Sequence, residues 1–181
     1  QQLDERIAPT QYALKTWDGV VAVEAVAERS MALLGRPLDI DLEATPHLCW
    51  LWRVDAPLAT ADMRTKAGDD YAARVYLSFR IAPEALGLGT RAKLALARSI
   101  YGDQVPDAAL NYVWDNRQPV GTSMPNAYTD RTRMIVLRSG TGDAGGWVIE
   151  RRDVAEDFKR AFGEVPAQLS GIALASDTDN T

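Results

Sequence analysis

Two stretches of this chain alternate between apolar and polar faces, and this period-two pattern limits what the chain can fold into. In residues 47–54, Trp50 and Trp52 share one face with two further apolar residues. In residues 71–79, an apolar face that starts at Tyr71 is opposed by a face that carries Arg74. Because successive side chains of a strand point to opposite faces, both stretches predict strands with one buried face. We therefore expect Trp50 and Trp52 to be largely buried.

Six further segments show shorter versions of the same pattern. Turn signals rich in glycine and proline separate several of them. Many short strands joined by regular turns favour a mainly β domain, an antiparallel β-sandwich or jelly roll with two short helices, which covers residues 1–181 as a single unit. The six segments are 11–16, 19–26, 110–115, 133–138, 147–152 and 170–175.

The first helix is predicted over residues 90–101. Its apolar residues recur at helical spacing, which favours a stripe packed on the rest of the domain. A glycine follows the segment directly and is typical of a helix end. The stripe consists of Leu94, Ala97, Ile100 and Tyr101.

The second helix is predicted directly after Asp153. Asp153 and Glu156 have the spacing of a capping box. Phe158 and Phe162 are four residues apart and form an apolar pair on one side of a helix. Gly163 supplies the end of the helix.

The composition excludes several classes of protein. Of the 181 residues, 46% are hydrophobic and 25% are charged, as in an ordinary globular domain. The formal net charge of −5 argues against a general polyanion partner, because binding to nucleic acid or to an anionic membrane needs clustered lysine and arginine, and only local basic patches remain open. No apolar run approaches the length of about 20 residues that crosses a bilayer, so we expect no membrane span. The single cysteine, Cys49, excludes an internal disulfide, and its apolar neighbours predict a buried, inert thiol.

Both ends of the sequence are typical of a processed or partial chain. The first residue is Gln1 rather than methionine, and a removed secretory signal would account for it, so we expect a periplasmic or secreted protein. At the other end, the predicted strand 170–175 runs into the polar string 176–181. Such a string normally joins two elements. We therefore expect that a final C-terminal strand is missing and that the sheet edge beside 170–175 is empty.

The same polar string contains the one candidate metal site. Asp177, Asp179 and Asn180 have the spacing of a calcium-binding loop. The glycine and the distal glutamate of an EF-hand are absent, so a turn is the simpler interpretation and calcium the alternative. We expect no other cofactor.

Polar residues on the predicted strands provide the main candidates for a ligand site. Asp69 and Asp70 precede strand 71–79, whose polar face carries Arg74. Inside the scaffold an Asp–Arg pair is a brace, whereas on an open face it binds hydroxyl groups or a carboxylate, and we favour the brace. Asn111, Tyr112 and Trp114 offer an amide and an aromatic platform, as sugar-binding surfaces do, but core packing of Tyr112 and Trp114 is the simpler interpretation.

Charged residues on two later strands complete the candidate set. Glu150 and Arg152 share a face, for which a solvated or mutually paired patch is the default interpretation. The candidate ligand-binding residues are therefore Asp69, Asp70, Arg74, Asn111, Arg133, Glu150 and Arg152.

The sequence contains no recognisable catalytic signature. His47 is the only histidine, and both a histidine zinc site and a Ser/His/Asp triad need partners that the sequence does not place beside it. With 25 acidic residues, two carboxylates at glycosidase separation are expected by chance. We therefore assign no catalytic residue.

The chain from about residue 46 to its end resembles a bacterial family of domains of unknown function, family 3047. The resemblance implies a jelly-roll-like domain that is exported to the cell envelope and has no established activity or agreed catalytic residues. In similar sequences the final motif is followed by glycine and a last aromatic-rich strand, which this sequence lacks. The matching stretches are CWLWRVD, KAGDDYAARVYLSF, LNYVWDN, NAYTDRTRMIVLRSG, WVIERRDVAEDFKRAFGEVP and GIALASDTDNT.

Three hypotheses for function follow. The first is a non-catalytic ligand-binding module of the bacterial envelope, with carbohydrate as the best guess for the ligand. The second is an enzyme that acts on an envelope polysaccharide through carboxylates such as Asp70, Glu150 or Asp177, which requires a cleft and a raised pKa. The third is a structural subunit of an envelope assembly, in which another envelope protein supplies a strand.

Overall fold

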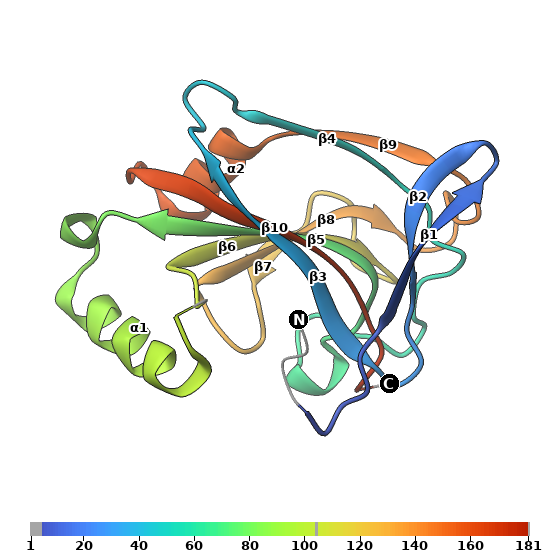
Figure 1. The fold of residues 1–181 in the computed structure, drawn as a ribbon, viewed down its shortest axis with the longest axis horizontal. Coiled ribbons are helices and arrows are strands. Elements are labelled where there is room, and N and C mark those ends of the chain that lie inside the picture. The colour runs from blue at the N-terminus through green and yellow to red at the C-terminus, as the bar shows by residue number, and fades with distance from the viewer. Residues whose placement is uncertain (1–4, 104, 181) are drawn as a thin grey trace.

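A six-stranded sheet forms the centre of the molecule in the computed structural model, which describes residues 5–103 and 105–180 (Figure 1). The strands lie in the order β3-β10-β5-β6-β8-β7. The mainly β fold class is thus confirmed. The bounds are β3 (Met31–Ile40), β5 (Tyr71–Ile81), β6 (Ala108–Asp115), β7 (Ser123–Pro125), β8 (Thr132–Ser139) and β10 (Ala167–Asp177).

One pair of neighbouring strands in this sheet is parallel. β6 and β8 run in the same direction, whereas the other pairs of the sheet are antiparallel. The antiparallel prediction is therefore wrong at this pair. Parallel neighbours need a connection of about a dozen residues or more, and residues 116–131, which include β7, provide it.

A smaller layer covers one face of the large sheet and encloses the main core. It consists of β4 (His47–Trp52), its antiparallel partner β9 (Val148–Asp153), and the helix α2 (Val154–Phe162). Trp52 is 7% exposed and packs against Trp114, with ring centroids 5.6 Å apart. Trp50 is half-buried and packs against Tyr112. Burial of the two tryptophans is confirmed for Trp52 and is partial for Trp50.

The helix α2 follows the sequence prediction closely. The Asp153 carboxylate accepts a hydrogen bond of 2.9 Å from the Glu156 N–H and caps the helix. The Phe158 ring lies 4.6 Å from that of Phe79 on β5, which holds the helix against the sheet. Gly163 ends the helix with a φ of 87°, a conformation that favours glycine.

A separate hairpin joins β1 (Gln11–Trp17) and β2 (Val20–Val26). Its two-residue loop, Asp18 and Gly19, has positive φ at both positions, as a type I′ turn requires. In Figure 1 the hairpin lies at the opposite end of the molecule from the helix α1 (Leu88–Tyr101).

The helix α1 differs from its prediction in the face that it buries. Leu94 is buried and Ala97 is half-buried, as expected, but Ile100 is 63% exposed. The helix also begins at Leu88, two residues before the predicted start. The side chain of Tyr101, which we placed on the same stripe, lies outside the described part of the chain.

A bulge at the start of β5 moves Tyr71 to the opposite face from the one predicted. Asp177 of β10 lies opposite Tyr71 and Ala175 lies opposite Arg74, so three steps on β5 match two on β10. Tyr71 therefore shares a face with Arg74, whose guanidinium carbon lies 5.4 Å from the centre of the Tyr71 ring.

The strand β10 lies inside the sheet. β3 pairs with one of its edges and β5 with the other, so the expected empty edge beside residues 170–175 is not found. The strand β3, which was not predicted from the sequence, occupies this edge. Whether a further strand follows β10 stays a prediction.

Two further predictions concern the environment of Cys49 and the lack of a membrane span. Cys49 is exposed on β4, so the prediction of a buried thiol is wrong. Alternation explains the error, because Cys49 lies on the face of β4 that points away from the core. Among the described residues, no helix is both long enough and apolar enough to cross a membrane.

Candidate functional site

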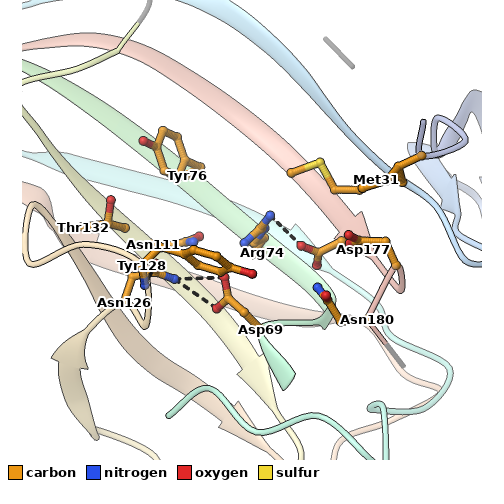
Figure 2. Close-up of a pocket in the computed structure, with 12 residues that line it drawn as sticks. Met31, Asp69, Arg74, Tyr76, Asn111, Asn126, Tyr128, Thr132, Asp177 and Asn180 are labelled. Carbon is orange, nitrogen blue, oxygen red and sulfur yellow. Dashed lines mark hydrogen bonds and ion pairs between the residues drawn. The ribbon is translucent and has the colours of Figure 1, made fainter. Parts of the chain in front are cut away.

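A cavity of about 400 Å³ lies over the face of the large sheet opposite the main core (Figure 2). Side chains of three central strands line it, among them Arg74 and Tyr76 from β5, Asn111 from β6 and Thr132 from β8. The ends of β3 and β10 and the loops around the sheet complete the lining with Ile7, Met31, Asp69, Asn126, Tyr128, Asp177, Asp179 and Asn180.

An ion pair between Arg74 and Asp177 lies at the centre of the site. The Arg74 Nη2 lies 2.6 Å from the Asp177 Oδ2, and both side chains are less than 10% exposed. The Tyr71 backbone N–H, at the β5 bulge, donates to the Asp177 Oδ1 at 2.9 Å. Asp177 therefore both pairs with the arginine and satisfies a backbone donor of the bulge.

Asp69 forms a second group of contacts beside Arg74. Its carboxylate accepts hydrogen bonds from the Tyr71 hydroxyl at 3.0 Å and from the Asn126 side-chain amide at 3.0 and 3.1 Å. These bonds join the loop before β5 to the loop before β8. Figure 2 shows Asp69 and Asn126 on one side of Arg74 and Asp177 on the other.

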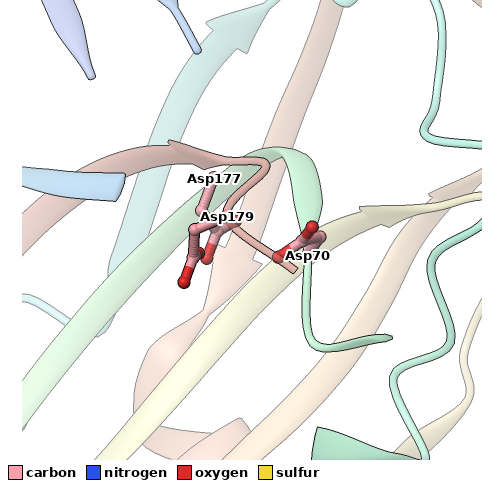
Figure 3. A group of neighbouring side chains, drawn as sticks. All are labelled: Asp70, Asp177 and Asp179. Atoms are coloured by element: carbon pink, nitrogen blue, oxygen red, sulfur yellow. The ribbon is translucent and has the colours of Figure 1, made fainter. Parts of the chain in front are cut away.

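A third group of carboxylates lies where β10 ends. Oxygen atoms of Asp70, Asp177 and Asp179 lie within 4.8 Å of one another (Figure 3). Asp70 accepts hydrogen bonds from both the backbone N–H and the side-chain amide of Asn180. The Asn180 side chain thus donates to a carboxylate in this cluster.

Among the described residues, the site thus brings together four carboxylates, Asp69, Asp70, Asp177 and Asp179, and one guanidinium, so the local charge is negative. Burial raises the pKa of Asp177 to about 6, because the attraction of Arg74 and the Tyr71 N–H only partly offset the loss of water. Burial also raises the pKa of Asp69, against the opposing effects of Arg74 and Asn126. The pKa of Asp179 is raised by burial and by the neighbouring Asp70.

Two buried polar atoms in the cavity lining have no hydrogen-bond partner in the described structure. They are the Arg74 Nε and the Asn111 Oδ1. Asn111 is 1% exposed, so bulk water does not reach its side chain in this state. An unsatisfied buried polar atom costs about 1–3 kcal/mol, and a ligand or an ordered water that bonds to it would recover that energy.

The titration of Asp177 makes a testable difference to stability. In the unfolded chain this carboxyl has its ordinary pKa of 3.8, and in the folded chain the pKa is about 6. Between these values the folded state holds more protons, so the free energy of unfolding falls as pH rises, by about 3 kcal/mol in total. Asp177→Asn lacks this titration, so we expect the variant to gain stability relative to wild type between about pH 4 and pH 6.

Urea denaturation of both proteins across this pH range measures the difference. Above about pH 7 the difference should be constant, because Asp177 is then ionised in both states. If the difference in the free energy of unfolding between the two proteins is constant from about pH 4 upwards, the folded Asp177 titrates at its ordinary pKa.

The structure brings together only part of the predicted ligand set. Asp69, Arg74 and Asn111 line the cavity, and Asp70 lies in the carboxylate cluster at its side. Arg74 is held in an ion pair inside the scaffold, but the partner is Asp177 and not the predicted Asp69 or Asp70, and the Arg74 side chain also lines the cavity.

The other three predicted ligand residues lie elsewhere. Arg133 lies two residues before the inward-facing Ile135 on β8, so it shares the face of Ile135 and lies on the opposite face from Arg74. Glu150 lies on β9 and accepts hydrogen bonds from the side chains of Arg138 and Trp52. The third residue, Arg152, forms two hydrogen bonds to Asp157 of α2. Alternation along a strand predicts which face a side chain is on, but not which residues of other elements contact that face.

Several lining residues were not predicted. Tyr76 shares the polar face of β5 with Arg74, so the alternation contained the signal for it. Asn126 and Tyr128 lie in a turn after Pro125, where the Asn126 side chain accepts from the Tyr128 N–H at 2.9 Å. The sequence marks this segment as a turn, but not which strand ends it covers.

The structure gives partial support to each of the two interpretations of the predicted calcium ligands, a metal site and a turn. Asp177 and Asp179 do converge with Asp70, but Asp177 is already paired with a cation, Arg74. Asp177 is still part of β10, so the predicted loop begins later than expected. We propose no metal for this cluster, and calcium binding stays a prediction.

Comparison with known proteins places the chain in a family. No curated protein matches it. A family model described as "Protein of unknown function (DUF3047)" matches residues 1–181, which is the whole chain. The resemblance noted in the sequence is thereby confirmed, and the chain belongs to the DUF3047 family of proteins of unknown function.

Proposed function

We propose that the protein binds a small, neutral, hydroxyl-rich ligand in the cavity over β5 and β6, and that this ligand is a carbohydrate. The observation that supports the proposal is the pair of unpartnered atoms, Arg74 Nε and Asn111 Oδ1, in residues that line the cavity. One of these atoms donates hydrogen bonds and the other accepts them. A hydroxyl group does both, so a sugar suits the two atoms together.

The charges of the cavity also favour a sugar over an anionic ligand. The carboxylates of Asp69, Asp177 and Asp179 line it and accept hydrogen bonds from hydroxyl groups. Arg74 is the one cation among the described residues that line the cavity, so a phosphate or carboxylate ligand would meet repulsion from these groups.

An aromatic side chain gives the cavity an apolar wall. Tyr128 is 57% exposed, and its hydroxyl is held by the Lys66 carbonyl at 3.0 Å, so one end of the ring is fixed in position. Sugar rings present C–H groups on their faces and hydroxyls at their edges. An aromatic face with polar groups around it therefore matches both parts of such a ligand.

Asn111→Leu tests the proposal through opposite effects on binding and stability. The substitution keeps the side-chain shape but removes the unpartnered oxygen, so we expect stability to be unchanged or to rise by about 1 kcal/mol. Binding should weaken about tenfold or more, because the ligand loses a buried hydrogen bond. Thermal melts and a glycan array, followed by calorimetry with the oligosaccharide that binds, measure the two effects.

Tyr128 provides a matched pair of variants for the same assay. Tyr128→Phe keeps the ring and should retain most of the binding, whereas Tyr128→Ala should lower it about tenfold. Neither change should alter stability much, because the side chain is exposed. If no glycan binds wild type, or if Asn111→Leu binds as well as wild type, the proposal is wrong.

A second candidate is an enzyme that cleaves a polysaccharide in the same cavity. The observation that favours it is the carboxyl of Asp177, with a pKa of about 6, whose oxygens lie within 4.8 Å of those of Asp70 and Asp179. A proton donor next to an ionised carboxylate is the arrangement that glycoside hydrolysis uses. Mass spectrometry of the oligosaccharide after incubation separates the two candidates, because a binding module leaves it intact.

A further inference from the structure

The helix α1 turns an apolar face toward solvent. Leu88 is 81% exposed, and Leu96 and Ile100 are each 63% exposed. Leu96 follows Leu88 by eight positions and Ile100 follows Leu96 by four, so the three lie on one side of the helix, and the exposed Ala92 fills the gap between Leu88 and Leu96. Large apolar side chains gathered on one exposed face mark an interaction surface.

The opposite side of α1 is fixed to the protein. Leu94 is buried, and Arg98 donates to the Asp107 carboxylate at 2.8 Å and to the Val105 carbonyl at 3.0 Å. The helix therefore cannot rotate to bury its apolar face without breaking these contacts. Figure 1 shows α1 projecting from one end of the sheet, away from the covering layer.

The charges of α1 have the opposite sign to the chain as a whole. The helix contains Arg91, Lys93 and Arg98 and no acidic residue, whereas the net charge of the chain is −5. Arg91 and Lys93 are exposed, and neither forms an ion pair with any described residue. At 100° per residue, Arg91 and Lys93 fall on either side of the apolar stripe.

We propose that α1 docks on the surface of an anionic lipid bilayer, with Leu88, Leu96 and Ile100 inserted between the headgroups. An exposed apolar stripe with cations on both sides is how an amphipathic helix lies in a membrane interface. The inserted leucine and isoleucine side chains supply apolar burial, and Arg91 and Lys93 supply attraction to lipid phosphates. With one short helix and two free cations, the binding is expected to be weak and reversible.

Vesicle sedimentation of the whole chain tests this proposal. We expect the protein to sediment with vesicles of equal parts phosphatidylcholine and phosphatidylglycerol, and much less with phosphatidylcholine alone. Leu96→Glu should lower the partition coefficient about tenfold or more, because it places a charge in the inserted face. The double variant Arg91→Gln and Lys93→Gln should lower it about 25-fold, which is about fivefold for each cation removed.

The matched control is Leu14→Glu. Leu14 is 74% exposed on the hairpin at the opposite end of the molecule, so this variant should bind vesicles like wild type. The proposal is overturned if wild type does not sediment with anionic vesicles, or if Leu96→Glu sediments as wild type does. It is also overturned if light scattering without lipid shows a dimer that Leu96→Glu dissociates, since a second copy then covers the helix.

Discussion

Replacing Arg74 with methionine is expected to lower the free energy of unfolding by about 3–5 kcal/mol at neutral pH. Arg74 is 8% exposed and pairs with Asp177 at 2.6 Å, and Asp69 lies close enough to raise the pKa of the arginine. Removing the guanidinium leaves two buried carboxylates without a cation, and methionine cannot satisfy either. Urea denaturation at constant pH measures the change.

Arg151→Met is the matched control for this variant. Arg151 is exposed on β9, so the same change in side chain should alter stability by no more than about 0.5 kcal/mol. If Arg74→Met is as stable as wild type, Arg74 is not a brace. Glycan binding, measured where Arg74→Met is still folded, then tells whether the guanidinium also contacts the ligand.

Truncating Trp52 to alanine should cost about 3–5 kcal/mol as well, for a different physical reason. The Trp52 ring fills the space between the two layers, 5.7 Å from the Trp50 ring and 5.6 Å from the Trp114 ring. Its Nε1 also donates to Glu150 at 3.2 Å. The variant leaves a large cavity and removes one of the hydrogen bonds that Glu150 accepts, and both effects lower stability.

Trp17→Ala makes the same chemical change at an exposed site. Trp17 is 39% exposed on β1, and its main side-chain contact is with Arg53. We expect this variant to lose about 1 kcal/mol or less. Equal losses for the two tryptophan variants, measured by urea denaturation, would show that the packing between the layers is loose around Trp52.

Local sequence patterns predicted the elements that bury one face or carry a cap. The alternation in β4 and β5 and the cap of α2 at Asp153 all appear in the structure. β3 was missed because Gly35 and Pro37 interrupt its pattern. The structure tolerates Pro37 because β3 is an edge strand and Pro37 lies at a bulge in its pairing with β10.

The site was predictable where its residues lie next to a strong local pattern. Asp69, Asp70 and Arg74 flank or belong to the clearest strand, and Asp177 is the last residue of another. The approach of Asp177 to Arg74 depends on β10 pairing with β5 across more than half of the chain. No local signal contains that pairing, and the same is true of the parallel pair β6 and β8.

The position of β10 in the sheet has a consequence for how the chain folds as it is synthesised. β3 joins the other strands of the sheet only through β10, although β10 is the last strand of the described chain to leave the ribosome. Until then, β3 and the open edge of β5 have no partner, and they are exposed to other nascent chains. Pairing across such long sequence separations is also slow. The sheet is therefore expected to stay incomplete until β10 has been synthesised, and chaperones that hold unpaired strands should raise the yield of the domain.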